Sequence, residues 1–363
     1  MATENALRSN TPAPRSGGQW ISCNAPYGAG GLGLHLAHLV EHARENGELG
    51  GYSCARPRTG DEQIGQAISS GLAAALLRWS PARYSPGWKS FIHVDAFDRS
   101  VASAMAAAPE SLVAFVGQAL HSFRKARRLG TSRLILVAAN SHVSNVATQH
   151  RLAIKRYPLE SSWLNRAQIA KTLREYELAD QIHVATDYTF ESFVAQGVPA
   201  EKLVKVPLTV SDRFTPAGRK PFDGVFRVVY VGSLTVAKGI PLLVDAFERL
   251  SIPNAELVLV GGWATRGMKA YLRSACARNA RIKLRAGDPL PHLLQASVCV
   301  HPTYEDGFAY APMEAKACGV PVIVSSDTGM KEYVEAGVDG SVFPTGDLEA
   351  LISCIRDVYR ETV

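Results

Sequence analysis

Apolar and polar positions along the first half of the chain follow two periods, one typical of strands and one typical of helices. Short apolar runs predict strands at 19–25, 51–55, 89–94, 133–138 and 181–185. Amphipathic stretches predict helices at 32–44, 62–78, 111–129 and 164–178. Strands that alternate with helices in this way are typical of an α/β architecture with parallel sheets.

A change of composition interrupts this alternation near the middle of the chain. Residues 207–224 contain three prolines and two glycines and show little periodicity, which is typical of a linker. The alternation then resumes, and its strands are apolar on both faces, as buried parallel strands are. These strands are predicted at 226–232, 255–262, 281–287, 297–302 and 320–326.

The pattern predicts two Rossmann-like domains. Residues 19–208 form the first domain, 209–224 the linker and 225–363 the second domain, and residues 1–18 precede them as a disordered tail. Ligands of such sheets bind beyond the carboxyl ends of the strands. We therefore expect the two sets of strand ends to face each other across a cleft.

Composition agrees with a folded two-domain chain. The 363 residues correspond to two domains of about 150 residues each. No apolar run approaches the ~18 residues that a membrane span needs, and the first residues lack the apolar block of a signal peptide. The six cysteines are scattered singly, without metal-binding spacing, which favours reduced thiols in a cytoplasmic protein.

The net charge of +6 is unevenly placed. Residues 120–175 contain eleven Lys or Arg and two acidic residues, an excess of +9. This segment is either a solvated helix face or a surface that attracts an anionic partner, such as an anionic membrane on the cytoplasmic face. Aromatic residues are sparse in it, so we do not expect nucleic acid as a partner.

A glycine-rich loop follows the first predicted strand. Gly28, Gly30 and Gly33 spell G-x-G-x-x-G, which brings backbone close to a phosphate at the start of a helix. A dinucleotide-dependent oxidoreductase also needs an acid ~20 residues later, at the end of the second strand. Glu48 has this spacing but precedes the strand, and Arg56 stands at its end. The oxidoreductase therefore remains only an alternative.

A second group of chemical residues follows a strand that is predicted to end at His301. A loop with Asp306 leads into a helix that begins near Pro312 and contains Glu314. Loop amides at a helix N-terminus form an anion site. The Glu314 carboxylate can accept hydrogen bonds from the paired hydroxyls of a ribose, and Asp306 can bind those of a second polyol. A phosphate with two polyols is the shape of a sugar nucleotide.

These residues and their surroundings resemble those of a known enzyme family. Asp306-x7-Glu314 followed by "AKACGVPVI", and "VVYVGSLTVAKGIPLLVDAFERL" upstream of it, are similar to motifs of retaining glycosyltransferases of the GT-B fold, family four. "AELVLVGG", the Thr328, Gly329 and Glu332 set, and "NSHVSN" at Asn140 add to the resemblance, which covers about residues 19–360. "NSHVSN" and "REYELADQIHVATDYTFESFVAQGVPAEKL" from Arg174 resemble a branch of the family that is frequent in polysaccharide biosynthesis.

The resemblance implies roles for individual residues. Glu314 would bind the ribose, Asp306 the transferred sugar and Lys238 the diphosphate, while His142 would lie near the anomeric carbon. The implied catalytic residues are His142, Lys238 and Asp306. The implied donor-binding residues are Gly30, Gly31, Ser233, Lys238, Asp306, Gly307, Phe308, Ala309, Tyr310 and Glu314.

Three further residues are candidates with a structural alternative. His93 and Asp95 follow the predicted strand 89–94 and either face the cleft or end the sheet. Glu332 either touches the nucleotide edge or caps a helix.

The sequence departs from the family at two site positions. Ser233 stands where the family usually has an Arg that shares the diphosphate charge with the Lys, and Asp306 stands for the commoner Glu. Family members also usually continue beyond the helix predicted at 348–360. Ser233 keeps open a second alternative, a non-catalytic partner that binds sugar nucleotides or glycans.

The resemblance implies a hexosyltransferase that uses a UDP- or GDP-linked sugar and a glycan, lipid-linked or small-molecule acceptor. In the mechanism proposed for the family, the acceptor attacks on the face from which the phosphate leaves. We expect no metal and no other cofactor, because the sequence has no D-x-D pair to hold a divalent ion on the diphosphate.

Overall fold

The computed structural model describes residues 18–69, 75, 77, 79–263 and 265–362. By its contacts the chain divides into two compact units. Unit 1 comprises Met1–Pro81, Phe91–Val137 and Ala170–Ile182, and unit 2 comprises Ala82–Ser90, Ala138–Ile169 and His183–Val363. The predicted tail 1–18 lies, apart from Gly18, outside the described residues, and the predicted domain boundaries stay a prediction.

The first sheet has seven strands in the order β3-β2-β1-β4-β5-β6-β7. β1 pairs in parallel with both β2 and β4, and β4 pairs in parallel with β5. The bounds are β1 (Gln19–Pro26), β2 (Leu49–Arg56), β3 (Gly65–Ala67), β4 (Ser111–Phe115), β5 (Arg133–Ala138), β6 (Gln181–Val184) and β7 (Leu203–Lys205).

Helices connect these strands. They are α1 (Gly30–Glu45), α3 (Pro86–Ala104), α4 (Leu120–Leu129), α5 (Val143–Arg156), α6 (Arg166–Leu178) and α7 (Asp187–Val194), with short 3₁₀ turns at Pro81–Tyr84 and Ala200–Lys202. Leu36 and Val40 lie one turn apart on α1, the spacing that places both on one helix face. They are fully buried in one cluster with Ile21 of β1 and Val113 of β4.

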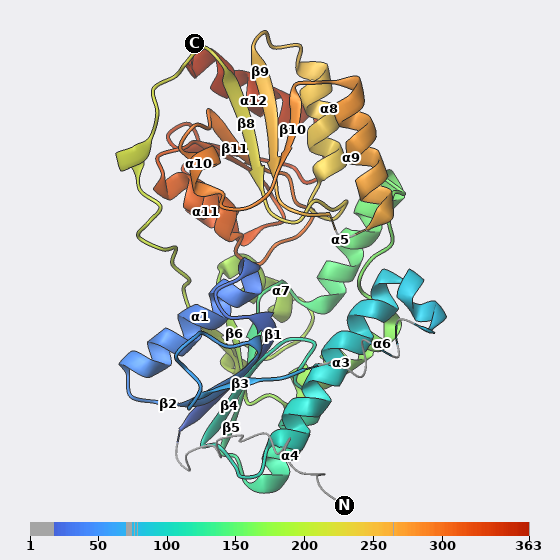
Figure 1. Ribbon diagram of the computed structural model, residues 1–363, viewed down its shortest axis with the longest axis vertical. Coiled ribbons are helices and arrows are strands. Elements are labelled where there is room, and N and C mark those ends of the chain that lie inside the picture. Colours follow the sequence, from blue (N-terminus) through green and yellow to red (C-terminus); the bar gives the residue numbers. More distant parts are fainter. Residues whose placement is uncertain (1–17, 70–74, 76, 78, 264, 363) are drawn as a thin grey trace, which may run out of the picture. The chain divides into compact units, whose positions relative to one another are not determined.

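The second sheet has six strands in the order β10-β9-β8-β11-β12-β13, and its strand pairs are parallel. Figure 1 shows β8, β9 and β11 side by side in this sheet. The strands are β8 (Phe226–Val231), β9 (Ala255–Val260), β10 (Ile282–Arg285), β11 (Val298–His301), β12 (Val322–Ser325) and β13 (Gly340–Phe343). The helices are α8 (Ile240–Leu250), α9 (Arg266–Arg278), α10 (Leu290–Leu293), α11 (Tyr310–Ala317) and α12 (Leu348–Thr362), with 3₁₀ turns at Pro216–Gly218 and Gly329–Tyr333.

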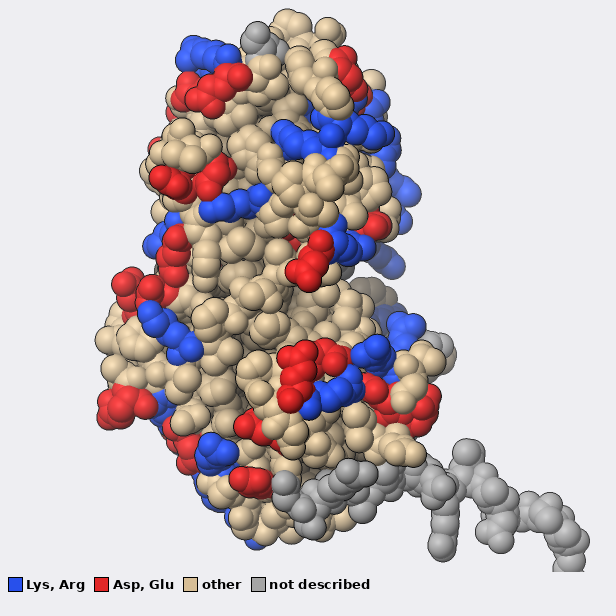
Figure 2. Space-filling model, turned by 90° about the vertical axis from the view of Figure 1, so that its left-hand side faces the viewer, with Lys and Arg blue, Asp and Glu red and all other residues tan. Residues whose placement is uncertain are grey.

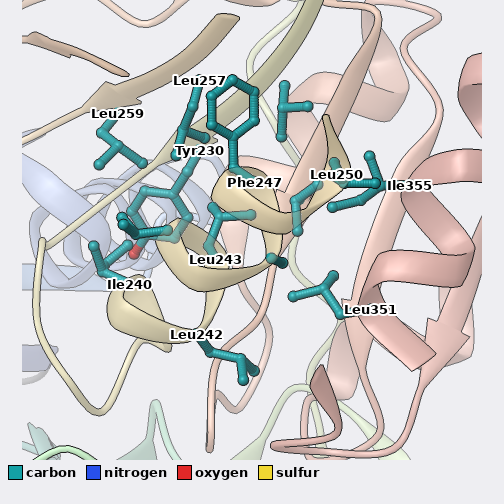
Figure 3. Packing of buried hydrophobic residues seen from close by; sticks show 14 of the residues in the cluster. Tyr230, Ile240, Leu242, Leu243, Phe247, Leu250, Leu257, Leu259, Leu351 and Ile355 are labelled. Atoms are coloured by element: carbon teal, nitrogen blue, oxygen red, sulfur yellow. The ribbon is translucent and has the colours of Figure 1, made fainter. Parts of the chain in front are cut away.

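The largest buried cluster lies between this sheet, α8 and α12. Figure 3 shows Leu243 and Phe247 of α8 near Tyr230 of β8 and Leu257 of β9. Ala153 of α5 is buried in the same cluster, and Tyr157 and Leu159 pack against it. Burial of apolar surface is the main favourable term in folding, and these contacts explain why residues 138–169 belong to unit 2.

The structure confirms most predicted strands and corrects three segments. Residues 89–94, predicted as a strand, lie within α3, so His93 and Asp95 are on a helix and not beyond a strand. Residues 111–129, predicted as one helix, form strand β4 and then α4. The prediction of a helix at 62–78 fails at least at β3.

The physical reason is the ambiguity of short apolar runs. All five residues of β4 are buried, so they show no alternation that distinguishes a strand from a helix. In α3, Phe97 and Val101 are buried one helical turn apart, a spacing that lies outside the short run at 89–94.

Some basic side chains of the segment 120–175 form ion pairs with acidic neighbours. Arg127 contacts Asp180 at 2.7 Å, and the Lys171 Nζ atom lies 2.8 Å from Asp98. Figure 2 shows basic and acidic side chains interspersed over one face of the molecule. Within the described ranges, no helix combines the length and the apolar character that a membrane crossing needs. Contact with an anionic membrane stays a prediction.

We predict that Gly33→Ala destabilises unit 1. A Cβ atom at Gly33 would lie 2.2 Å from the Pro26 carbonyl oxygen, so α1 must shift away from β1. We expect a loss of about 1–3 kcal/mol in the free energy of unfolding, as for an overpacked core position. Gly31→Ala is the matched control, because no atom lies within 4 Å of its Cβ position. Chemical denaturation of both variants measures the difference, and equal stabilities would contradict the packing role of Gly33.

Candidate functional site

The site in unit 2 is built around an ion pair at the carboxyl ends of β8 and β11. Lys238 lies in the loop between β8 and α8, and Asp306 lies in the loop after β11. The Lys238 Nζ atom is 2.6 Å from Asp306 Oδ2 and donates to the Glu305 carbonyl at 3.1 Å. Burial alone would raise the pKa of Asp306, but Lys238 and His301 outweigh it and hold this pKa below its usual range. Asp306 is therefore ionised at neutral pH.

His301, the last residue of β11, contacts the Asp306 carboxylate of this pair. Its Nε2 atom lies 3.2 Å from Asp306 Oδ2, and its ring stacks on Tyr230 with centroids 5.9 Å apart. Burial lowers the pKa of His301 against the opposing effect of Asp306. A neutral ring whose Nε2–H donates to Asp306 fits this geometry.

Helix α11 begins directly beyond this loop. Its N-cap residue, Ala309, has a left-handed conformation with φ 67° and makes no side-chain cap. That conformation costs roughly 1–2 kcal/mol for a residue with a Cβ atom. The helix N-terminus thus presents backbone N–H groups without a side-chain cap from its own N-cap residue, and such N–H groups attract anions.

Glu314 lies in the second turn of α11 and is 7% exposed. Burial raises its pKa to about 7, and the charge of Arg213 opposes this increase. Arg213 pairs with Asp288 at 2.6 Å. Within the described part of the chain, no group donates a hydrogen bond to the Glu314 carboxylate. Its oxygens can therefore accept hydrogen bonds from a ligand.

His142 is the N-cap residue of α5, and its Nδ1 atom accepts a hydrogen bond from the Ser144 amide at 3.2 Å. This contact fixes the ring proton on Nε2. Burial lowers the pKa of His142 to about 4, so the ring is neutral at pH 7. The His142 amide donates to Ser192 Oγ, and the ring contacts Phe193 edge-on.

Residues 305–307 and 329–332 contact two segments from the first half of the chain that belong to unit 2. The Gly307 carbonyl accepts from Thr186 Oγ1 at 2.8 Å. The Glu332 carboxylate accepts from the Asp187 amide at 2.9 Å and from the Tyr188 amide, and these two residues begin α7. Of the two roles weighed for Glu332, the structure shows the helix cap.

The remaining site candidates have various surroundings. Ser233 is exposed, and its carbonyl accepts from the Tyr230 hydroxyl at 3.0 Å. Phe308 is buried and packs edge-on against the ring of Tyr310. Gly30 and Gly31 begin α1 in unit 1, with no atom within 4 Å of their Cβ positions. In the same unit, Glu48 precedes β2, which ends at Arg56.

Asp95 belongs to an ionic cluster of unit 1 and to no strand end. It contacts Arg99 at 2.7 Å, and His121 and Lys171 at 3.0 Å. Burial would raise the pKa of Asp95, but these three partners lower it to about 2. Its surroundings are those of a structural carboxylate that joins α3, α4 and α6.

Two residues of the unit 2 site were not among the sequence candidates. His301 was interpreted only as the end of a strand, and Glu305 was given no role. A buried apolar run that ends in His immediately before an acidic loop was the available signal for His301. Nothing in the sequence indicated which residues the Glu305 side chain contacts, because the partners of its carboxylate lie more than 160 positions away.

Comparison with known proteins gives one family match and several relatives. Residues 214–362 match the family described as glycosyl transferases group 1. The capsular polysaccharide biosynthesis glycosyltransferase CapM of Staphylococcus aureus is 28% identical over 141 residues, which are 38% of this chain and 37% of that protein. The match thus spans little more than a third of the length of that relative.

Two solved structures align over nearly the whole chain. Sucrose-phosphate synthase of Thermosynechococcus elongatus aligns with a TM-score of 0.72 and 20% identity, over 95% of this chain and 90% of its own. HepE of Anabaena, in complex with UDP and glucose, aligns with a TM-score of 0.67 and 17% identity over the same shares. At these identities the likeness establishes the fold. The chain has the GT-B fold, and its residues 214–362 match the glycosyl transferases group 1 family.

Proposed function

We propose that this chain is a glycosyltransferase that moves a sugar from a UDP- or GDP-linked donor to a glycan, lipid-linked or small-molecule acceptor. The observation that carries the proposal is the arrangement in unit 2 of Lys238, Asp306 and Glu314 around the N-terminus of α11. A cation, amides at a helix N-terminus and two carboxylates match the diphosphate and the two polyols of a nucleotide sugar. HepE, which aligns over most of the chain, binds UDP and glucose.

The donor lies, in this proposal, along the carboxyl ends of β8 and β11. Glu314 accepts hydrogen bonds from the ribose hydroxyls, and Asp306 from hydroxyls of the transferred sugar. Lys238 and the amides of residues 307–310 stabilise the diphosphate. Ser233 stands where the family usually has an Arg that shares the diphosphate charge. Lys238 and these amides therefore stabilise a larger part of the negative charge of the departing diphosphate in this chain. A phosphate-binding role of Gly30 and Gly31, which lie in unit 1, stays a prediction from the sequence.

In the proposed reaction the bond between the anomeric carbon and the diphosphate breaks, and a bond to the acceptor hydroxyl forms on the same face. The acceptor proton goes to the departing phosphate, and the anomeric configuration is retained. Stabilisation of the leaving oxygens is the main catalytic contribution, and it comes from Lys238 and backbone amides without a metal ion. His142, neutral with its proton on Nε2, is a hydrogen-bond donor at the sugar.

We predict that one nucleoside diphosphate raises the melting temperature of the chain, in a comparison of UDP, GDP and ADP. The matching nucleotide sugar is then turned over, and EDTA leaves the rate unchanged. We expect Lys238→Ala to lower kcat by about 10²–10³-fold, as loss of one donor to a developing oxyanion does. Release of the nucleoside diphosphate measures the rate.

Lys220→Ala is the matched control, because Lys220 is an exposed lysine of the same unit. The configuration of the product, read from its anomeric proton by NMR, should equal that of the donor, and an inverted product contradicts retention. Nucleotide binding without turnover of any donor would favour the non-catalytic alternative, whereas protection by NADPH alone would favour the oxidoreductase.

We also predict that nucleotide affinity rises with pH through the pKa of Glu314, about 7 in the free chain. Only the carboxylate accepts two hydroxyl hydrogen bonds, so its protonation below pH 7 weakens binding. Between pH 6 and pH 8 the affinity should rise about tenfold through this group. Glu314→Gln is the control, since the nucleotide phosphates titrate alike with both proteins. Isothermal titration calorimetry measures the nucleotide affinity at each pH. Affinities of the wild type and Glu314→Gln that change with pH in the same way would contradict the role of Glu314.

A further inference from the structure

Glu305 is a buried carboxylate that the proposed reaction does not use. It immediately precedes Asp306 and is 2% exposed. Burial raises its pKa against the opposing charge of Lys238. A carboxylate in such a place is costly unless both oxygens have donors. Its contacts therefore indicate what it does.

Both carboxylate oxygens of Glu305 accept hydrogen bonds from the loop before α5. Oε1 accepts from the Ser141 amide at 2.8 Å, and Oε2 accepts from the Asn140 side-chain amide at 2.8 Å. The next residue in this loop is His142. The Glu305 side chain thus holds the two residues that precede the proposed sugar-side histidine.

The main chain of Glu305 contacts the donor-side lysine. Its carbonyl accepts from Lys238 Nζ at 3.1 Å and from Thr303 Oγ1 at 2.8 Å. One residue therefore bonds to the proposed diphosphate ligand through its backbone and to the His142 loop through its side chain. This double contact links the proposed diphosphate ligand to the loop that carries the proposed sugar-side histidine.

The backbones of the two segments also approach closely at Gly307, two residues after Glu305. A Cβ atom at Gly307 would lie 2.3 Å from the Ala139 carbonyl oxygen, so the two backbones are in direct contact. Behind the loop, the His142 amide is bonded to Ser192, and Asn145 donates to the Tyr188 hydroxyl at 3.0 Å. Glu305 supplies the polar contacts on the side of this loop that faces Asp306.

We infer that Glu305 is a positioning residue that sets the distance of His142 from the Lys238–Asp306 pair and thereby the rate of sugar transfer. The inference rests on the proposed function and deepens it. Without the carboxylate, the Ser141 amide and the Asn140 side chain lose their acceptor, and the loop can move. Lys238, Asp306 and Glu314 keep their side chains, so binding of the nucleotide is retained.

The test compares Glu305→Ala, Glu305→Gln and Asn140→Ala in the full chain with the donor found by the nucleotide comparison. We expect Glu305→Ala to lower kcat by about 10–100-fold, the effect of displacing a group by about 1 Å. The Kd of the nucleoside diphosphate should stay within about twofold, because the side chains proposed to bind the nucleotide are unchanged. Glu305→Gln should recover most of kcat, since its oxygen accepts from Ser141 and its amide pairs with a turned Asn140 side chain.

Tyr157→Phe is the matched control. It removes a hydrogen bond of 2.7 Å to Asp245, which joins the end of α5 to α8 away from the 140–142 loop. A purely structural role of Glu305 would give equal kcat values for Glu305→Ala and Tyr157→Phe at equal loss of stability, and this result overturns the inference. If Glu305→Ala does not fold, Asn140→Ala is the deciding variant. A kcat of Asn140→Ala equal to that of the wild type also overturns the inference.

Hydrogen exchange separates failure of this inference from failure of the proposed function. In Glu305→Ala the Ser141 amide should exchange faster, while amides of the Lys238 loop keep their protection. A wild-type chain that turns over no donor contradicts the proposed function, and the positioning role falls with it. An active wild type with unchanged exchange at Ser141 and unchanged kcat in Glu305→Ala contradicts the positioning role alone.

Discussion

The contact between Lys238 and Asp306 is the constraint on which the rest of the unit 2 site depends. Both side chains are largely removed from water, and breaking such a pair leaves an uncompensated charge. The fold satisfies them by bringing the ends of β8 and β11 together, with His301 below and the Glu305 carbonyl beside them. The same cation is then in place for a diphosphate, and Lys238 together with His301 keeps Asp306 ionised. In this account structural stability and donor binding use one set of charges.

The loops of this pair are held by segments from the first half of the chain. Glu160, which follows α5, accepts from the Val236 amide at 2.6 Å and from Thr265 at 2.7 Å. Thr186 and the N-terminus of α7 bond to Gly307 and Glu332. These contacts explain why residues 138–169 and 183–208 group with the second sheet. A boundary drawn from composition at 208 follows the linker, whereas the contacts group these two segments with the loops around Lys238 and Asp306.

Five of the six strands of the second sheet could be predicted from sequence because their signals are local, whereas β13 was not predicted. Runs such as "FRVVYV" are apolar on both faces and are bounded by glycine, and the Asp306-x7-Glu314 spacing lies within one loop and one helix. β4 was missed because full burial removes its alternation, and α3 was missed because its buried face extends beyond the short run that was read as a strand. The partners of Glu305 and Glu332 were not predictable, because they depend on how distant segments pack. The cap made by Glu332 illustrates this, since a helix-capping acid and a ligand-binding acid look alike in sequence.

The central claim is that Lys238, the α11 amides and Glu314 form the binding site of the nucleotide sugar. A crystal structure of the chain with the nucleoside diphosphate that it binds tests this most directly. The account predicts that the diphosphate lies against Lys238 Nζ and the amides of residues 307–310, with the ribose hydroxyls on Glu314. A nucleotide bound with its ribose away from Glu314 and its phosphates away from Lys238 would contradict the account.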